Sequence, residues 1–168
     1  MSRRVLATTT IALAAALATL GTGAVPAHAG SKPNPCKLLK RSEIAKQFGG
    51  ATVSPGEAGL STAVSKSCEF EVAESTDFPE GSVHVSVMTT GAKVAYDAHK
   101  KKPAFGYLPV AGMSNALWSD TTHALEALKG ATLVTVQPLF LSAETLPIRA
   151  VDTQAQAIAL LKLALKRA

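Results

Sequence analysis

Aromatic residues and cysteines are scarce in this 168-residue chain. It has five Phe, two Tyr and one Trp, so aromatic residues make up 5% of the sequence, and it has only two Cys. Hydrophobic residues nevertheless reach 47% of the chain. A buried core must therefore be built mainly from Val, Leu, Ala and Ile, which are among the residues most often found inside proteins.

Recognisable catalytic motifs are also missing. The sequence contains no His-Glu-x-x-His, no Gly-x-Ser-x-Gly, no Ser-x-x-Lys and no glycine loop that could cradle phosphate. Gly91 separates an expected strand from an expected helix, where anions can bind, but a single glycine is a weak signal. We therefore assign no catalytic, cofactor-binding or metal-binding residue from the sequence.

The two cysteines, Cys36 and Cys68, can pair in only one way. A metal or redox pair would need a Cys-x-x-Cys spacing or neighbouring His ligands, and the sequence has neither. In an exported protein the default for two such cysteines is a disulfide bond. Closing a loop of about 33 residues should stabilise the folded state by about 3–4 kcal/mol.

The first 29 residues have the parts of a secretory signal peptide. Ser2-Arg3-Arg4 is a basic start, an apolar run follows to Val25, and Ala27-His28-Ala29 is a small-x-small cleavage site. We expect cleavage after Ala29 and a secreted, extracellular product, with the general secretory and twin-arginine routes both open. An uncleaved membrane anchor is the alternative, because the run is long enough to span a bilayer. No second apolar run of that length follows.

The charge of the mature chain is modest. Loss of Arg3 and Arg4 with the signal leaves 15 basic and 12 acidic residues, a net charge of +3. The charges are spread out except at Lys100–Lys102, which we interpret as cations at a helix C-terminus, where the helix dipole favours them. Since no nucleic-acid-binding motif accompanies these lysines and the product is exported, we expect no nucleic-acid partner.

The remaining sequence predicts a flexible lead, 30–35, followed by one domain of the α+β class, 36–168. Strands linked by hairpins, without strand–helix–strand alternation, indicate a curved antiparallel sheet of about five strands with helices packed on one face. The expected strands are 67–73, 82–89, 114–119, 123–128 and 132–137, with a loop or a weak first strand within 51–66. The expected helices are 42–48 with Ser42 as N-cap, 92–102 with a stripe of Val94, Ala95 and Ala98, and a last one from Asp152 or Thr153 to about Arg167.

The clearest pattern is the alternation in residues 67–73 and 82–89. In the first segment Cys68, Phe70 and Val72 fall on one face and glutamates on the other, which is typical of a half-buried strand. The second segment repeats the alternation, so the two predict an antiparallel hairpin. Glu69 should then come close to His84 across the hairpin, which we interpret as an ion pair rather than a catalytic pair.

Several short motifs resemble those of small exported actinobacterial domains of unknown function. They are Pro35-Cys36-x-Leu38-Leu39, Phe48-Gly49-Gly50, Ser67-Cys68-Glu69-Phe70, the turn 110–116 before Trp118, the hairpin at Lys129-Gly130 and the Leu-rich last helix. The resemblance covers about residues 34–166. It implies no catalytic residues, so none are transferred. Many members of this family are lipoproteins, whereas this chain lacks the cysteine to which the lipid would be attached.

Four residues are candidates for a ligand or partner surface. Phe105 and Tyr107 lie in an expected loop, where aromatic side chains often mark binding surfaces. His84 and His123 lie on expected strands and could share one face of the sheet. A core role is expected instead for Trp118.

These observations predict a secreted, non-catalytic module that binds a protein, a peptide or a small ligand in the extracellular space or cell envelope. One alternative is a small secreted hydrolase in which His84 or His123 acts with a carboxylate; those side chains would have to converge in a pocket. Another is a secreted inhibitor that presents the irregular segment 73–81 or 138–147. Neither segment is closed by its own disulfide, so it would be poorly preorganised.

Overall fold

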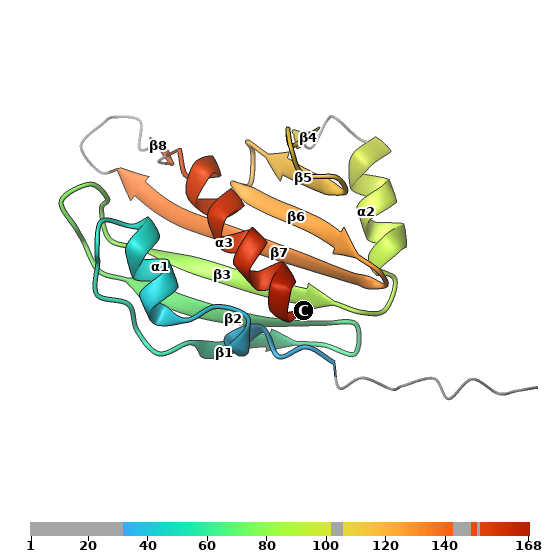
Figure 1. The fold of residues 1–168 in the computed structure, drawn as a ribbon, viewed down its shortest axis with the longest axis horizontal. Helices are drawn as coiled ribbons and strands as arrows, with labels where there is room; N and C mark the ends of the chain where they lie inside the picture. Colours follow the sequence, from blue (N-terminus) through green and yellow to red (C-terminus); the bar gives the residue numbers. More distant parts are fainter. Residues whose placement is uncertain (1–31, 102–105, 143–148, 151) are drawn as a thin grey trace, which may run out of the picture. The chain divides into compact units, whose positions relative to one another are not determined.

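The chain's computed structural model describes residues 32–101, 106–142, 149–150 and 152–168 (Figure 1). Residues 1–29, which we expected to be a signal peptide, Phe105 and residues 143–147 of the proposed inhibitor loop lie outside these ranges. The elements are, in chain order, the 3-10 helix η1 (Pro35–Lys37), α1 (Arg41–Gln47), β1 (Glu57–Ser61), β2 (Ser65–Val72), β3 (Gly81–Met88), α2 (Ala92–Lys101), β4 (Tyr107–Pro109), β5 (Ala116–Ser119), β6 (Ala124–Lys129), β7 (Thr132–Ser142), β8 (Arg149–Ala150) and α3 (Gln154–Arg167). Within the described ranges no helix is long and apolar enough to cross a membrane.

The strands form an antiparallel sheet in the order β1-β2-β3-β7-β6-β5-β4, and the short β8 pairs with β7. The α+β class and all five expected strands are confirmed, as is the β2–β3 hairpin, in which Cys68 lies opposite Val85. The expected number of strands was too low, because β4 and β8 are added and the segment 51–66, left open as a loop or a weak first strand, forms β1. Each of these three is short, five residues or fewer, and carries no clear alternation.

Strand β7 is longer than its sequence pattern suggested. We expected it to end at Gln137, before an irregular segment beginning with Pro138, yet the strand continues to Ser142 and Pro138 pairs with Val83 of β3. The ladder between β7 and β6 reaches only as far as Val136, so Pro138 lies where β6 no longer pairs with β7. Proline lacks an N–H group, and at this position no bond to β6 is lost.

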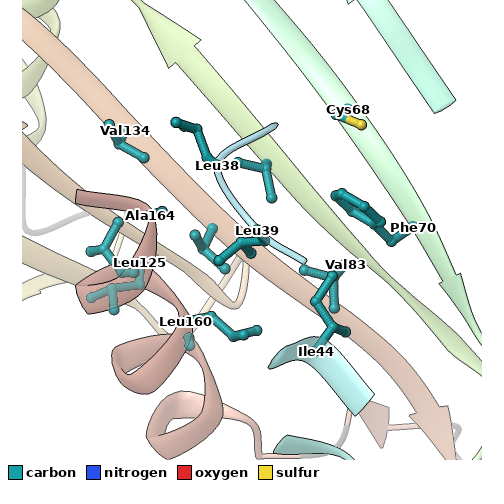
Figure 2. Packing of buried hydrophobic residues seen from close by; sticks show 14 of the residues in the cluster. Leu38, Leu39, Ile44, Cys68, Phe70, Val83, Leu125, Val134, Leu160 and Ala164 are labelled. Carbon is teal, nitrogen blue, oxygen red and sulfur yellow. The ribbon is translucent and has the colours of Figure 1, made fainter. Parts of the chain in front are cut away.

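The main core lies between one face of the sheet and a layer of α1, α3 and η1 (Figures 1 and 2). Inward side chains of β2 and β3, such as Phe70 and Val83, contact this layer, and Leu125 and Val134 continue the same surface toward α3. The expected core role of Trp118 is confirmed, because its side chain is buried in this cluster. The fully buried residues of α3 are Ala157, Leu160, Leu161 and Ala164.

Helix α2 lies on the other face of the sheet, so the expectation that the helices cover one face is wrong. Its buried side chains, Ala92 and Tyr96, pack with Leu117 and Leu133, which alternate with the residues of the main core along β5 and β7. The expected apolar stripe was wrong at Val94, which is 74% exposed, whereas Ala95 packs against this second cluster. Since α2 covers only part of this second face, the sheet is enclosed on both sides near α2 and open over β1 and β2.

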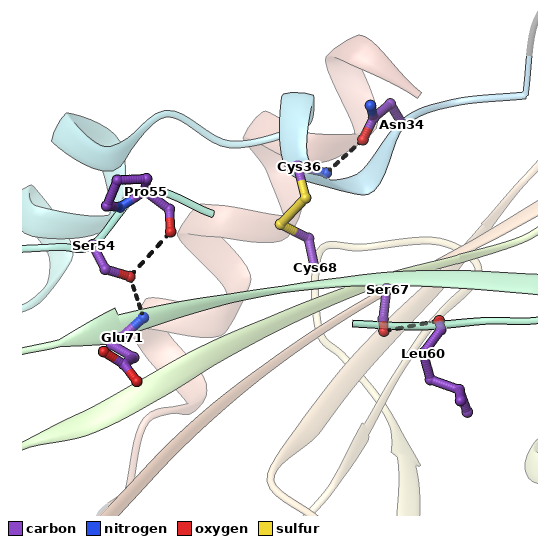
Figure 3. Close-up of a disulfide and its surroundings, with 8 residues drawn as sticks. All are labelled: Asn34, Cys36, Ser54, Pro55, Leu60, Ser67, Cys68 and Glu71. Carbon is purple, nitrogen blue, oxygen red and sulfur yellow. Dashed lines mark hydrogen bonds between the residues drawn. A yellow bond between two sulfur atoms is a disulfide. The ribbon is translucent and has the colours of Figure 1, made fainter. Parts of the chain in front are cut away.

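A disulfide between Cys36 and Cys68 ties η1 to β2, as the sequence predicted (Figure 3). The two Cα atoms lie 5.1 Å apart, and Cys68 is fully buried. Asn34 caps η1, since its side-chain oxygen accepts a hydrogen bond of 3.0 Å from the backbone N–H of Cys36. The bridge therefore holds the N-terminal end of the domain on the sheet.

A second tie joins the two ends of the described domain. The Nη1 atom of Arg167 donates to the backbone oxygen of Leu38 and to a carboxylate oxygen of Glu43, both at 2.7 Å. Glu43 also accepts the backbone N–H of Lys40 at 2.8 Å, so Lys40, and not Ser42 as expected, stands at the N-cap of α1. The guanidinium of Arg167 holds the pKa of Glu43 below its ordinary value.

Candidate functional site

The sheet face beneath α2 carries a groove of about 270 Å³. Its floor is formed by outward side chains of β3, β7 and β6, and one wall is formed by Ala95 and His99 of α2. The strand register explains this floor, because Ser86 lies opposite Thr135 and Thr135 opposite Glu126. The lining residues are Ser65, Ser86, Met88, Ala95, His99, Tyr107, Thr122, Ala124, Glu126, Leu133, Thr135 and Gln137.

A buried carboxylate paired with a histidine is the main chemical feature of the groove. The side chain of Glu126 is only 3% exposed, and that of His99 is 35% exposed. The Nδ1 atom of His99 lies 2.9 Å and 3.0 Å from the two carboxylate oxygens of Glu126. Burial raises the pKa of Glu126 above its ordinary value, and the hydrogen bond and charge of His99 oppose this shift in part.

Tyr107 covers one face of the His99 ring. The two ring centroids are 4.4 Å apart and the ring planes differ by 3°, a stacked arrangement. The side chain of Thr122 hydrogen-bonds to Tyr107, whose pKa is raised by burial and by the nearby charge of Glu126. His99 is therefore restrained at its edge by a carboxylate and on its face by a phenol ring.

Hydroxyl and amide groups complete the polar part of the groove. Ser86 and Thr135 supply side-chain hydroxyls from neighbouring strands, and each of these can donate or accept a hydrogen bond. Gln137 donates its side-chain N–H to the backbone oxygen of Thr122 at 2.6 Å, which leaves its carbonyl oxygen as an acceptor. The groove thus offers several hydrogen-bonding groups on a floor of paired strands.

His84 lies on the same face of the sheet as the groove, directly opposite Gln137. Its Nε2 atom is 2.7 Å from a carboxylate oxygen of Glu69, which confirms the expected cross-strand pair. Both side chains are well exposed, at 38% and 43%. The pair is therefore largely hydrated, which is typical of a surface ion pair rather than of a catalytic site.

His123 lies apart from His84, so the two histidines do not form one site. Its ring packs against Trp118 of the main core in a T-shaped contact, with centroids 6.0 Å apart. Its φ of 52° places it in a tight turn before β6. The Nδ1 atom of His123 is buried and has no hydrogen-bond partner. Of the four residues expected to form a surface, Tyr107 lines the groove, His84 lies next to it and Phe105 is outside the described residues.

Glu126 was not among the site residues predicted from the sequence. The only signal was a carboxylate between the apolar residues Leu125 and Ala127 in the expected strand 123–128, and this pattern does not tell which face of the strand is buried. The difficulty has a physical cause, since residues 124–127 are all buried and both faces of β6 are covered. Across the described ranges, no group of three His, Cys, Asp or Glu side chains could hold a metal ion.

No family model, curated protein or solved structure matches this chain. The resemblance to exported actinobacterial domains stays a prediction from short motifs.

Proposed function

We propose that this protein is a secreted, non-catalytic binding module that holds a small ligand in the groove beneath α2. The groove is built on hydrogen-bonded strands, so its floor is preorganised and little entropy is lost on binding. Its volume of about 270 Å³ lies near the lower end of the range for ligand pockets, which favours a small molecule or one side chain of a peptide.

The observation that carries this proposal is the burial of Glu126 at the groove. A carboxylate at 3% exposure costs free energy that an apolar side chain at the same position would not. Buried ionisable groups that line a cavity are more frequent in functional sites than elsewhere. A residue retained at such a cost, next to hydroxyl and amide groups that can contact a ligand, supports a binding role.

A fragment screen by two-dimensional NMR tests the proposal. We expect small polar fragments to shift amide resonances of Ser86, His99, Glu126 and Thr135 together. Ser86→Phe should fill the groove and abolish these shifts. Ser82→Phe is the matched control, because Ser82 lies on the same strand and the same face but outside the groove, and should leave the shifts intact. The proposal would be contradicted if the fragments shifted resonances all over the surface, or if the shifts at the groove persisted in Ser86→Phe.

Secretion is supported by the signal-like first 29 residues and by the disulfide, which is typical of oxidising compartments. An intact mass of the protein purified from the culture medium tests it. A chain beginning at Gly30 is the expected result. A mass that retains residues 1–29 would indicate a membrane-tethered protein instead.

A hydrolase is the second candidate, and the pairing of His99 with Glu126 favours it over the His84 and His123 expected from the sequence. A carboxylate that holds Nδ1 of a histidine leaves Nε2 available as a general base. Hydrolysis of p-nitrophenyl acetate by the wild type, by His99→Gln and by the control His84→Gln separates the candidates. Activity lost only in His99→Gln would favour the hydrolase, whereas equal rates in all three would exclude this role for His99.

A further inference from the structure

We propose that the ligand of the groove is a small organic cation, an amine or a guanidine, which binds to the His99–Glu126 pair and displaces the proton that this pair holds. The inference rests on the proposed function, because it names the class of ligand for the same groove.

The charge of the sheet face gives the first argument. The strand side chains that face the same way as Glu126 include Glu69 and Glu71 of β2 and Glu57 of β1, as the register shows. None of the described strand side chains on this face is Lys or Arg; Lys129 points to the other face, where it donates to backbone oxygens of α3. The face surrounding the groove is therefore acidic and complements a cation.

The lysines of α2 do not reverse this charge. The groove is lined by Ala95 and His99, which lie about one turn apart on a single stripe. Lys93 pairs with Asp97, one turn further along its own side of the helix. Lys101 is two residues beyond His99, roughly 200° around the helix from it, and is exposed. Lys100 is also exposed and, like Lys93 and Lys101, is not among the residues that line the groove, so the lysines of α2 contribute no side chain to it.

The second argument is the state of the His99–Glu126 pair without ligand. The only hydrogen-bond donor to Glu126 within the described part of the chain is Nδ1 of His99. A carboxylate this deeply buried is costly as an isolated anion, so the pair is most stable when it holds one proton and is neutral overall. The neighbouring tyrosines are uncharged at neutral pH: Tyr107 from β4 stacks on the ring, Tyr96 from α2 lies near Glu126, and both have raised pKa values.

Binding of a cation changes this balance. Nε2 of His99 has no hydrogen-bond partner in the described ranges, and His99 lines the groove. An ammonium group that donates to Nε2 brings one positive charge to the site, so the proton that the neutral pair held is no longer needed to balance the charge of Glu126 and is released to the buffer. The bound state is then ammonium, neutral His99 and ionised Glu126, with the same net charge as before. An anion would instead approach Glu126 and the acidic face, and would be repelled.

Calorimetry and NMR with three probes of similar size test the inference. The probes are n-butylammonium, the neutral 1-butanol and the anion butyrate. We expect n-butylammonium alone to shift resonances of the groove. Titrations in phosphate and in MES, which have different ionisation enthalpies and carry no primary ammonium group, should report the release of up to one proton per ligand. The affinity should then rise with pH over the range in which the proton is released, by at most about tenfold per pH unit.

Variants and outcomes separate this inference from the function on which it rests. Glu126→Gln should lose n-butylammonium binding, and Glu69→Gln, a carboxylate of the same face outside the groove, should retain most of it. If butanol or butyrate bound in the groove as tightly as the amine, the proposal of a cationic ligand would be wrong. The groove would still be supported as a binding site. Amine binding without proton release would also overturn the proposal, a measurement on the wild type that does not depend on whether Glu126→Gln folds.

Discussion

The ring of His99 lies parallel to the ring of Tyr107, with their planes 3° apart and their centroids separated by 4.4 Å. Tyr107 belongs to β4, the last strand at one edge of the sheet, and His99 belongs to the last turn of α2. The contact therefore joins the helix to the edge of the sheet. It also makes the position of the imidazole depend on two elements, which together fix its orientation at the groove.

Replacing His99 should destabilise the fold more than its exposure suggests. His99→Ala leaves the buried carboxylate of Glu126 without its hydrogen-bond donor, which should lower the free energy of unfolding by about 3 kcal/mol. Urea denaturation at pH 7 measures this loss. The double variant His99→Ala, Glu126→Gln should recover part of it, because a neutral amide is cheaper to bury. If the double variant lost as much as the sum of the single variants, the two side chains would not be coupled.

The contribution of Glu126 to stability should fall as the pH rises. Burial raises the pKa of Glu126 in the folded state, so the folded protein binds more protons than the unfolded chain above pH 4.5. The contribution is fully present below pH 4.5 and is lost as the pH rises through the folded-state pKa. Glu126→Gln does not titrate here, so its stability relative to the wild type should increase with pH above 4.5. Denaturation curves from pH 4 to 8 measure this change. If burial did not raise the pKa of Glu126, the difference in the free energy of unfolding between the variant and the wild type would be the same at every pH.

Loss of the disulfide should cost about 3–4 kcal/mol, the chain-entropy value for a loop of this length. The variant Cys36→Ala, Cys68→Ala removes the bridge without leaving a thiol, and reduction of the wild type provides an independent comparison. Both should unfold at lower urea concentrations than the oxidised protein. A change below about 1 kcal/mol would mean that packing of η1 on the sheet is sufficient to hold this end of the domain.

Acid should weaken the tie between α3 and α1. Arg167 lowers the folded-state pKa of Glu43, so the ion pair stabilises the protein above pH 4.5 and this contribution is lost as the pH falls through the folded-state pKa. Glu43→Gln should cost about 1 kcal/mol at pH 7 and progressively less in acid. Glu57→Gln on the exposed β1 is the matched control and should change stability little at any pH. An equal cost at pH 7 and pH 3 would show that the charge of Glu43 is not involved.

The parts of the fold that follow from local pattern could be predicted. Alternation in β2 and β3 gave both strands and their pairing, because a period of two residues places Cys68 and Phe70 on one face. The α3 helix was also predicted, since Gln154–Arg167 agrees with the expected span. The position of α2 could not be predicted. The side of a sheet on which a helix packs depends on the connections at both ends, and a weak stripe around Val94 and Ala95 gave no guidance.

The candidate groove was harder to predict than the fold. Tyr107 was selected because aromatic residues in loops often bind ligands, but its actual neighbour, His99, comes from a helix whose orientation was unknown. Glu126 lies 27 residues from His99 in sequence, and no local spacing connects them. Contacts of this kind arise from tertiary packing alone, so sequence periodicity can indicate each element but not the pair.

The two outer strands of the sheet affect how the protein behaves at high concentration. Exposed strand edges are templates on which further chains can add, and this is a common route to fibrils. Here the pairing of β1 is interrupted by a shift of register between Ala58 and Ser61, and β4 is only three residues long and ends in Pro109. A bulge and a proline both obstruct the addition of a flat strand. The folded protein should therefore resist fibril growth by strand addition at its sheet edges, even in concentrated solution.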